Sequence, residues 1–240
     1  MAVGVLESLD EKGGTEVMDL DITAFRRGPL SARVVFTNPL PPLPGFPHDP
    51  ADAVRWLSKA AVQGQVLAQY DLGLHYLLGS GVRMDQKASA GWFSKAAEQG
   101  DAAAQVALAA LYFSGRGVEQ DWRQGVRWSR AAALQGDATA QLLLGLAQEQ
   151  GDGDQPPDLA QAAHWFREAA KQGNSFAAFC LASLEEGGRG LPRNIADAVF
   201  WYRKAADAGD APAELKMGDL YWDGIVLPRD AEQRLESLSS

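Results

Sequence analysis

Residues 72–100 read LGLHYLLGSGVRMDQKASAGWFSKAAEQG, and the landmarks of this stretch return along the chain. A tryptophan recurs with spacings of 36, 36, 37 and 36 residues, at Trp56, Trp92, Trp128, Trp165 and Trp201. Eight residues after each of them stands a glycine: Gly64, Gly100, Gly136, Gly173 and Gly209. A fixed period between about 20 and 50 residues indicates stacked copies of one supersecondary unit. The sequence therefore predicts a repeat architecture.

Each unit contains the signals of two helices. Small or apolar residues spaced by 4, 1 and 3 positions, such as Ala68, Leu72, Gly73 and Tyr76, fall on one face of a first helix. Glycines follow that helix, since a glycine just past a helix adopts the left-handed conformation easily: Gly79, Gly115, Gly151 and Gly188. The second helix is expected to begin after a good N-cap residue, at Asp85, Asp121, Asp158 or Asn194.

The residue types indicate how the units pack. A small residue at Gly73, Ala109, Gly145, Ala182 and Gly218 lets two helices approach closely, and the tryptophan is expected to fill the space between neighbouring units. Two departures stand out: Glu185 takes the place of Tyr76, and Ser237 stands one period after Trp201. We therefore expect residues 230–238 to form a polar terminal helix, as repeat arrays need at their ends.

Composition limits the classes of function. The chain has 240 residues and a formal charge of −9, from 22 basic and 31 acidic residues, which argues against a nucleic-acid partner. No apolar stretch approaches the length of about 18–20 residues that a bilayer crossing needs, and no secretory signal is evident. The single cysteine, Cys180, cannot form an internal disulfide. The sequence predicts a cytoplasmic protein.

The first 49 residues differ from the rest. They are acidic and without periodicity at the start, so we expect a partly disordered leader with a proline-rich spacer at residues 39–44. The proline run is read as a spacer in preference to a ligand for an aromatic groove. Asp49 as N-cap and Pro50 at the first helical position place the boundary there, so residues 50–240 form the predicted repeat domain, with about five repeats of 36–37 residues.

The motifs Leu72-Gly73-x-x-Tyr76-x-x-Gly79 and Trp92-Phe93-x-Lys95-Ala96-Ala97-x-x-Gly100 resemble the Sel1-like repeat (SLR), which is related to the tetratricopeptide repeat. The resemblance covers about residues 50–230. It implies an all-α fold, a right-handed α/α superhelical solenoid of helix-turn-helix repeats, here preceded by an irregular leader. It further implies an adaptor or scaffold for protein complexes without shared catalytic residues. A cysteine-rich branch has a reported penicillin-binding activity, but Cys180 alone departs from that branch.

The tetratricopeptide analogy implies a partner-binding groove lined by the first helices. Its expected residues are largely apolar: Tyr70, Leu74, Leu77, Val106, Phe113, Leu142, Leu146, Phe179, Leu215 and Trp222. A large exposed apolar patch marks an interaction site, but tight curvature of the stack could instead bury these residues. Three occupants are open: a partner peptide or helix, the chain's own leader through residues 34–36 and its prolines, or a second copy contacting Trp222.

No chemistry-bearing cluster emerges. The histidines His48, His75 and His164 are scattered singly and lack the spacing of a helical metal site. Cys180 lies in an apolar helix, where a buried inert thiol is expected. The sequence predicts no catalytic residues, no metal and no cofactor. We interpret the chain as a non-enzymatic interaction adaptor, and the alternative is a regulatory subunit or hydrolase-like enzyme of the cysteine-rich branch.

Overall fold

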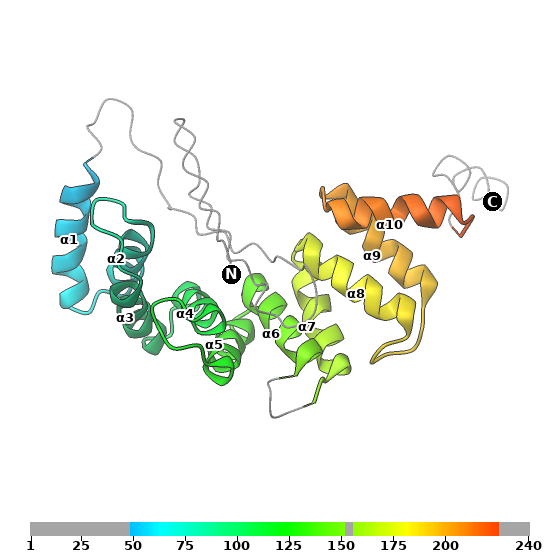
Figure 1. The fold of residues 1–240 in the computed structure, drawn as a ribbon, viewed down its shortest axis with the longest axis horizontal. Helices are drawn as coiled ribbons and strands as arrows, with labels where there is room; N and C mark the ends of the chain where they lie inside the picture. Colours follow the sequence, from blue (N-terminus) through cyan, green and yellow to red (C-terminus); the bar gives the residue numbers. More distant parts are fainter. Residues whose placement is uncertain (1–48, 152–155, 226–240) are drawn as a thin grey trace. The chain divides into compact units, whose positions relative to one another are not determined.

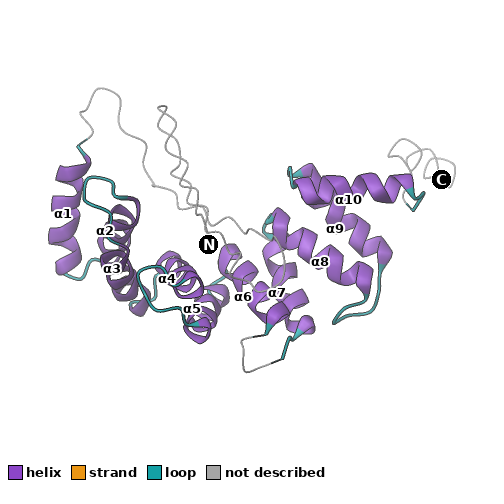
Figure 2. Ribbon diagram, viewed as in Figure 1, coloured by secondary structure: helices purple, strands orange, loops and turns teal. Residues whose placement is uncertain are grey.

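The computed structural model describes residues 49–151 and 156–225, and within these ranges every regular element is a helix (Figures 1 and 2). The helices are α1 (Pro50–Val62), α2 (Val66–Leu78), α3 (Gln86–Glu98), α4 (Ala102–Ser114), α5 (Trp122–Leu134), α6 (Ala138–Gln150), α7 (Leu159–Lys171), α8 (Ser175–Gly187), α9 (Ile195–Asp207) and α10 (Ala211–Trp222). The all-α repeat class that the sequence predicts is confirmed.

The described chain falls into two compact units that divide after Pro156. The first contains α1–α6 and the second contains α7–α10, and within each unit consecutive helices pack side by side (Figure 1). The predicted leader up to residue 48, residues 152–155 of the loop between α6 and α7, and the predicted terminal helix at residues 230–238 lie outside the described residues.

Helix α1 and the second helices α3, α5, α7 and α9 begin where the sequence predicts. Asp49 caps α1 by accepting hydrogen bonds from the amides of Ala51 and Asp52, with Pro50 at the first helical turn. The second helices begin after a side chain that accepts from a backbone amide within its first turn, at Asp85, Asp121, Asp158 and Asn194. These side chains satisfy amides that have no partner inside the helix.

Two glycines with different roles lie in the α2–α3, α4–α5 and α8–α9 loops. The first, such as Gly79 or Gly115, ends the preceding helix in the left-handed conformation, whereas Gly151 ends α6 with φ 80° and ψ 159°. The second glycine lets the loop contact the start of a neighbouring helix. A Cβ atom added to Gly117 would lie 2.1 Å from the carbonyl oxygen of Gln86, at the start of α3. Only a residue without a side chain fits there.

The core of a hairpin is a large ring set against a small residue. In the α2/α3 hairpin the ring of Phe93 lies over Gly73, where an added Cβ would come within 2.6 Å of Phe93 Cε1. In the α4/α5 hairpin the direction is reversed, since Phe113 of α4 lies against Gly125 of α5. Both phenylalanines are buried. The prediction that small residues allow close helix approach is confirmed at Gly73.

A row of buried glutamines links successive helices of the first unit. The amide of Gln69 donates to the carbonyl of Ala61 at the end of α1 (3.1 Å) and accepts from Gln99 after α3 (2.7 Å). One repeat later, Gln105 donates to Ala97 (3.1 Å) and accepts from Gln135 (2.9 Å). Buried polar groups are costly unless they are paired, so this glutamine ladder fixes how each helix sits on its neighbours.

The tryptophans pack between repeats to different degrees. Trp128 is 9% exposed, and Trp92 packs against the cluster of Ala61, Ala68 and Leu72. Trp56 is 61% exposed, with the ammonium of Lys59 4.2 Å from its ring centroid. Of the five repeat tryptophans only Trp128 is buried, whereas Trp92, Trp165 and Trp201 are half-buried and Trp56, in the first repeat, is exposed.

Candidate interaction surface

The structure places most of the expected groove residues inside the protein. Six of them are buried: Leu74, Leu77, Val106, Phe113, Leu142 and Leu146. Tyr70 and Phe179 are half-buried. A partner could not reach the six without opening the packing of the first unit, so they do not form an accessible apolar groove.

The reason is that this helix face closes the hairpin. The ring of Tyr70 lies 5.6 Å from that of Phe93 in the following helix, and Phe179 lies 5.5 Å from Tyr202 in the same way. Phe113 lies 4.7 Å from Trp122. The expectation from the tetratricopeptide analogy assigned to a partner the positions that hold each first helix to its own second helix. That is why the predicted groove was so apolar.

Two of the ten residues remain exposed, and both lie on α10. Leu215 is 70% exposed and Trp222 is 90% exposed. Together with Ala211 and Gly218 they form a stripe with helical spacing, which we call the α10 stripe (residues 211, 215, 218 and 222). Four residues one above another on a helix face, two of them large and apolar, form a surface that favours contact with another helix.

A comparison with α2 shows why the α10 stripe is open. Leu215 and Gly218 occupy the positions of Tyr70 and Gly73 in the repeat, which receive the ring of Phe93. A Cβ added to Gly218 would meet no atom of the described residues within 4 Å, whereas one added to Gly73 would meet that ring. Among the described residues, α10 has therefore no second helix of its own. The stripe is the face of a first helix that a second helix covers in the other hairpins.

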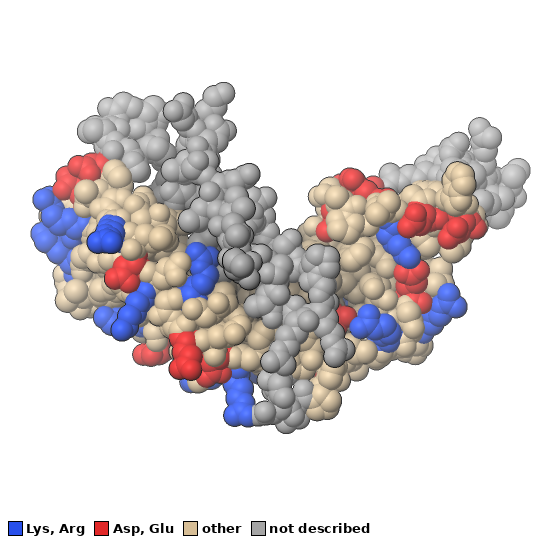
Figure 3. Space-filling model, viewed as in Figure 1, with Lys and Arg blue, Asp and Glu red and all other residues tan. Residues whose placement is uncertain are grey.

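Acidic side chains border this stripe. The exposed residues Glu214 and Asp219 lie beside it on α10 and Asp223 follows as the C-cap, and carboxylates appear in red over this end of the second unit in Figure 3. Phe200 and Ile225 are further exposed apolar residues of the same unit. An apolar stripe with an acidic border suits a partner helix that carries apolar and basic residues.

The residues with reactive or metal-binding side chains do not gather into a site. The thiol of Cys180 is buried, as expected. Within residues 49–151 and 156–225 no three His, Cys, Asp or Glu side chains converge in a way that could hold a metal ion. None of the described helices has the length and apolar character needed to cross a bilayer.

The repeat pattern itself matches a known family. The sequence model of the Sel1 repeat matches residues 43–65, 66–101, 102–137, 138–174, 175–210 and 211–233, which together are most of the chain. The chain belongs to the Sel1 repeat family. Sel1 repeat proteins generally act as protein-interaction modules. The first and last matched segments, residues 43–65 and 211–233, are shorter than the four between them.

Two solved structures of Sel1 proteins resemble this chain. One is c5321 of uropathogenic Escherichia coli, described as a protective antigen with an SLR fold: 39% identity, TM-score 0.71, and coverage of 73% of this chain and 38% of that one. The other is a Sel1 repeat protein from Oxalobacter formigenes, with 38% identity, TM-score 0.65, and coverage of 73% and 50%. This chain thus spans half or less of either relative. No curated protein matches it.

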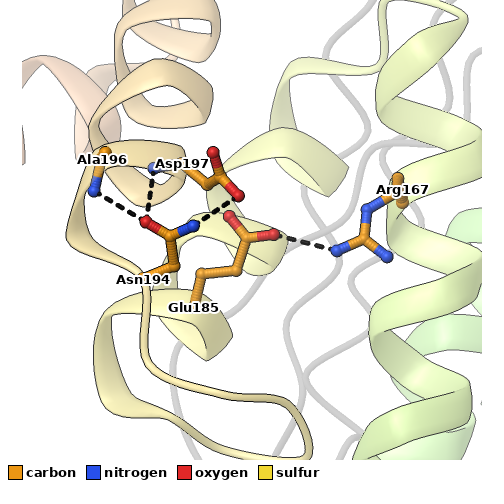
Figure 4. A network of polar contacts seen from close by, with 5 residues as sticks. All are labelled: Arg167, Glu185, Asn194, Ala196 and Asp197. Carbon is orange, nitrogen blue, oxygen red and sulfur yellow. Dashed lines mark hydrogen bonds and ion pairs between the residues drawn. The ribbon is translucent and has the colours of Figure 1, made fainter.

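Glu185, which departs from the tyrosine of the Sel1 repeat, forms a buried ion pair in the second unit (Figure 4). Its side chain is 2% exposed, and its Oε1 accepts from Arg167 Nη2 at 2.9 Å. Its Oε2 is buried without a hydrogen-bond partner among the described residues. Burial raises the pKa of Glu185, outweighing the hydrogen bond from Arg167. The arrangement is a structural contact between α7 and α8.

Glutamine is the residue type at the matching position Gln148 of the preceding repeat. Replacing Glu185 with glutamine should raise the unfolding free energy relative to the wild type, and this difference should grow as pH rises. A carboxyl group whose pKa is raised by folding stabilises the folded state while protonated and loses that contribution as it ionises. The unfolding free energy of E185Q, measured in urea, should gain on the wild type between about pH 4 and about pH 7.

Glu168→Gln supplies the control with the opposite sign. The hydrogen bond from Lys171 lowers the pKa of Glu168, so its ionised form contributes stability that is lost as pH falls. The wild type should therefore gain slightly on E168Q over the same rise in pH. Parallel curves for both variants would contradict the role given to burial at Glu185.

Proposed function

We propose that this Sel1 protein is a non-catalytic adaptor that binds an amphipathic helix on the α10 stripe. The observation that carries the proposal is the open position at Gly218, flanked by Leu215 and Trp222. In the complete α2/α3 hairpin the same position is filled by an aromatic ring. Binding of an amphipathic helix to an apolar helix face is a common mode of peptide recognition, and the stripe supplies the anchors for it.

The hairpins within the chain define what a partner helix should look like. Its residue opposite Gly218 should be large, as Phe93 is opposite Gly73, and its residue opposite Trp222 should be small, as Gly125 is opposite Phe113. In the chain's own second helices these two positions are four residues apart, as in Ser89 and Phe93 or Ala198 and Tyr202. Basic residues on the same helix would complement Glu214, Asp219 and Asp223.

A catalytic role has no comparable support. The hydrolase-like alternative needs an accessible nucleophile, and the chain's one cysteine, Cys180, is buried. The prediction of a cytoplasmic protein rests on the sequence alone.

A peptide with the sequence of residues 85–100 tests the proposal, because it contains α3 with its cap Asp85 and both Ser89 and Phe93. Fluorescence anisotropy of the labelled peptide, titrated with the full chain, should show saturable binding. L215D or W222D should weaken that binding by about tenfold or more, as expected for the loss of a central apolar anchor.

Two controls separate specific binding from general apolar attraction. A peptide with serine in place of Phe93 should bind weakly, since it cannot fill the space at Gly218. The variant F200D changes an exposed apolar residue outside the stripe and should leave binding unchanged. No saturable binding, or binding that L215D and W222D leave intact, would overturn the proposed function.

A further inference from the structure

The two ends of the described chain are complementary halves of a Sel1 hairpin. Helix α10 is a first helix whose partner-facing positions, Leu215, Gly218 and Trp222, are open. Helix α1 is a second helix: Trp56 stands at the repeat's tryptophan position, and α1 precedes α2 as α3 precedes α4. Within the described residues no first helix precedes it.

The face of α1 that a first helix would cover is partly accessible. Ala53 is exposed, while Leu57 and Ala60 are half-buried and pack against the cluster of Ala61, Ala68 and Leu72. The equivalents of these three α1 residues one or two repeats later, Gly125, Phe93 and Ala96, are all buried. This face and the α10 stripe are accessible for the same reason, since neither has the other helix of its hairpin among the described residues.

The side chains at the two faces follow the pattern of the hairpins within the chain, in which a large residue packs against a small one. Leu57 occupies the position of Phe93, so it can fill the space at Gly218. Ala53 occupies the position of Gly125, so it can accommodate the ring of Trp222. Large against small at both places is how α2/α3 and α4/α5 are packed within the chain. The proposed contact therefore continues an interface that the protein already uses.

The chain's own flanking segments fit these faces less well by sequence. In the repeat register, the residue 36 positions after Tyr202 is Leu238, which is large as the position opposite Gly218 requires. The residue 36 positions after Ala198 is Arg234, however, a long charged side chain at the position that has to be small opposite Trp222. A first helix before α1 would cover residues 30–42, which include Pro39, Pro41 and Pro42. Proline in a helix interior removes a hydrogen bond and clashes with the preceding turn.

We propose that α10 of one copy pairs with α1 of a second copy, joining the chains head to tail through an intermolecular Sel1 hairpin. The proposal rests on the proposed function, because it names the helix that the α10 stripe binds. A head-to-tail contact uses two different surfaces, so each copy keeps one free end and further copies can add. The formal charge of −9 opposes association at low salt, and added salt should strengthen it.

Sedimentation velocity of the full chain over a range of concentrations tests the proposal. The average mass should rise with concentration and with salt. Ala53→Arg and Leu215→Asp change exposed residues on α1 and α10, so the fold should persist, and each should weaken self-association by about tenfold or more. F200D serves as the matched control and should associate as the wild type does.

Mixing the two blocked variants gives the decisive result. A53R keeps a working α10 stripe and L215D keeps a working α1 face, so an equimolar mixture should form dimers that do not grow further. An interface that used the same surface on both copies would not be restored by mixing the two variants. A mixture that stays monomeric, or association that neither substitution weakens, would overturn the proposal.

The self-association experiment and the peptide experiment can fail independently, so the two proposals are tested separately. If the peptide of residues 85–100 binds the α10 stripe while the full chain stays monomeric, the second copy is not the partner and the proposed function stands. If association occurs only after residues 226–240 are deleted, the chain's own end occupies the stripe, and the head-to-tail proposal fails. If neither the peptide nor a second copy binds, both proposals fail.

Discussion

Replacing Gly117 with alanine is expected to lower the unfolding free energy by about 3–4 kcal/mol. Gly117 has φ 72°, a left-handed conformation that costs a residue with a side chain about 1–2 kcal/mol. The new Cβ would also lie 2.1 Å from the carbonyl oxygen of Gln86 and 2.9 Å from the amide nitrogen of Lys87. These are backbone atoms in the first turn of α3, so relief requires moving the helix.

Two other glycines separate the contributions. Gly136 has φ 91° but an added Cβ there meets nothing within 4 Å, so G136A should cost only the conformational part, about 1–2 kcal/mol. Gly91, inside α3 and also without neighbours, should gain about 0.5–1 kcal/mol as alanine. Urea unfolding followed by far-UV circular dichroism measures all three. Equal losses of unfolding free energy in G117A and G136A would show that the contact of Gly117 with α3 does not contribute to the cost of the substitution.

Trp128→Ala should cost about 3–5 kcal/mol, while Trp56→Ala should cost less than about 1 kcal/mol. The two residues hold the same position in the repeat and differ in cover: Trp128 is 9% exposed and Trp56 is 61% exposed. Truncating a buried ring removes apolar contact and leaves a cavity, whereas an exposed ring loses mainly its contacts with Lys59 and Arg55.

Urea unfolding of both variants, followed by circular dichroism and by tryptophan fluorescence, checks this expectation. Two probes are needed because repeat units can unfold separately, in which case one free energy does not describe the chain. Similar losses for W128A and W56A would mean that stability does not come from stacking of neighbouring repeats.

The helices could be predicted from the sequence because their signals are local and repeat. An N-cap such as Asp121, a glycine such as Gly115 and the apolar face between them act within a few residues, and several copies reinforce one another. The repeat pattern therefore predicts the starts of α1 and of the second helices, the glycines that follow the helices, and the all-α class. Gly151 differs from the other helix-ending glycines in its ψ angle, which no residue type could have revealed.

The accessible surface could not be predicted in the same way. Spacing shows that Val106, Leu142 and Leu74 share a face with Tyr70, but it does not show what covers that face. In the structure it faces the core, and the open apolar surface lies on α10 because no second helix follows it among the described residues. The sequence did not indicate an open α10, since Ser237 led to the expectation of a polar terminal helix at residues 230–238.

The glutamine ladder was also missed, although a signal was present. Gln69, Gln105 and Gln141 recur every 36 residues, as do Gln99 and Gln135. A polar residue beside the apolar face of a helix ordinarily faces solvent. Its regular recurrence in a buried register was the clue, since a side-chain amide can bridge a helix end to the next helix.

The ladder bears on how such a protein can change its length by gene duplication. A second copy of residues 102–137 would bring Gln105, Gln135 and Gly117 with it, and these residues contact neighbours through main-chain atoms or through another glutamine. Such an insertion needs no matching mutation elsewhere. A second copy of residues 175–210 would instead bring Ala178 and Ala208 at the glutamine positions, and could add length without that polar link.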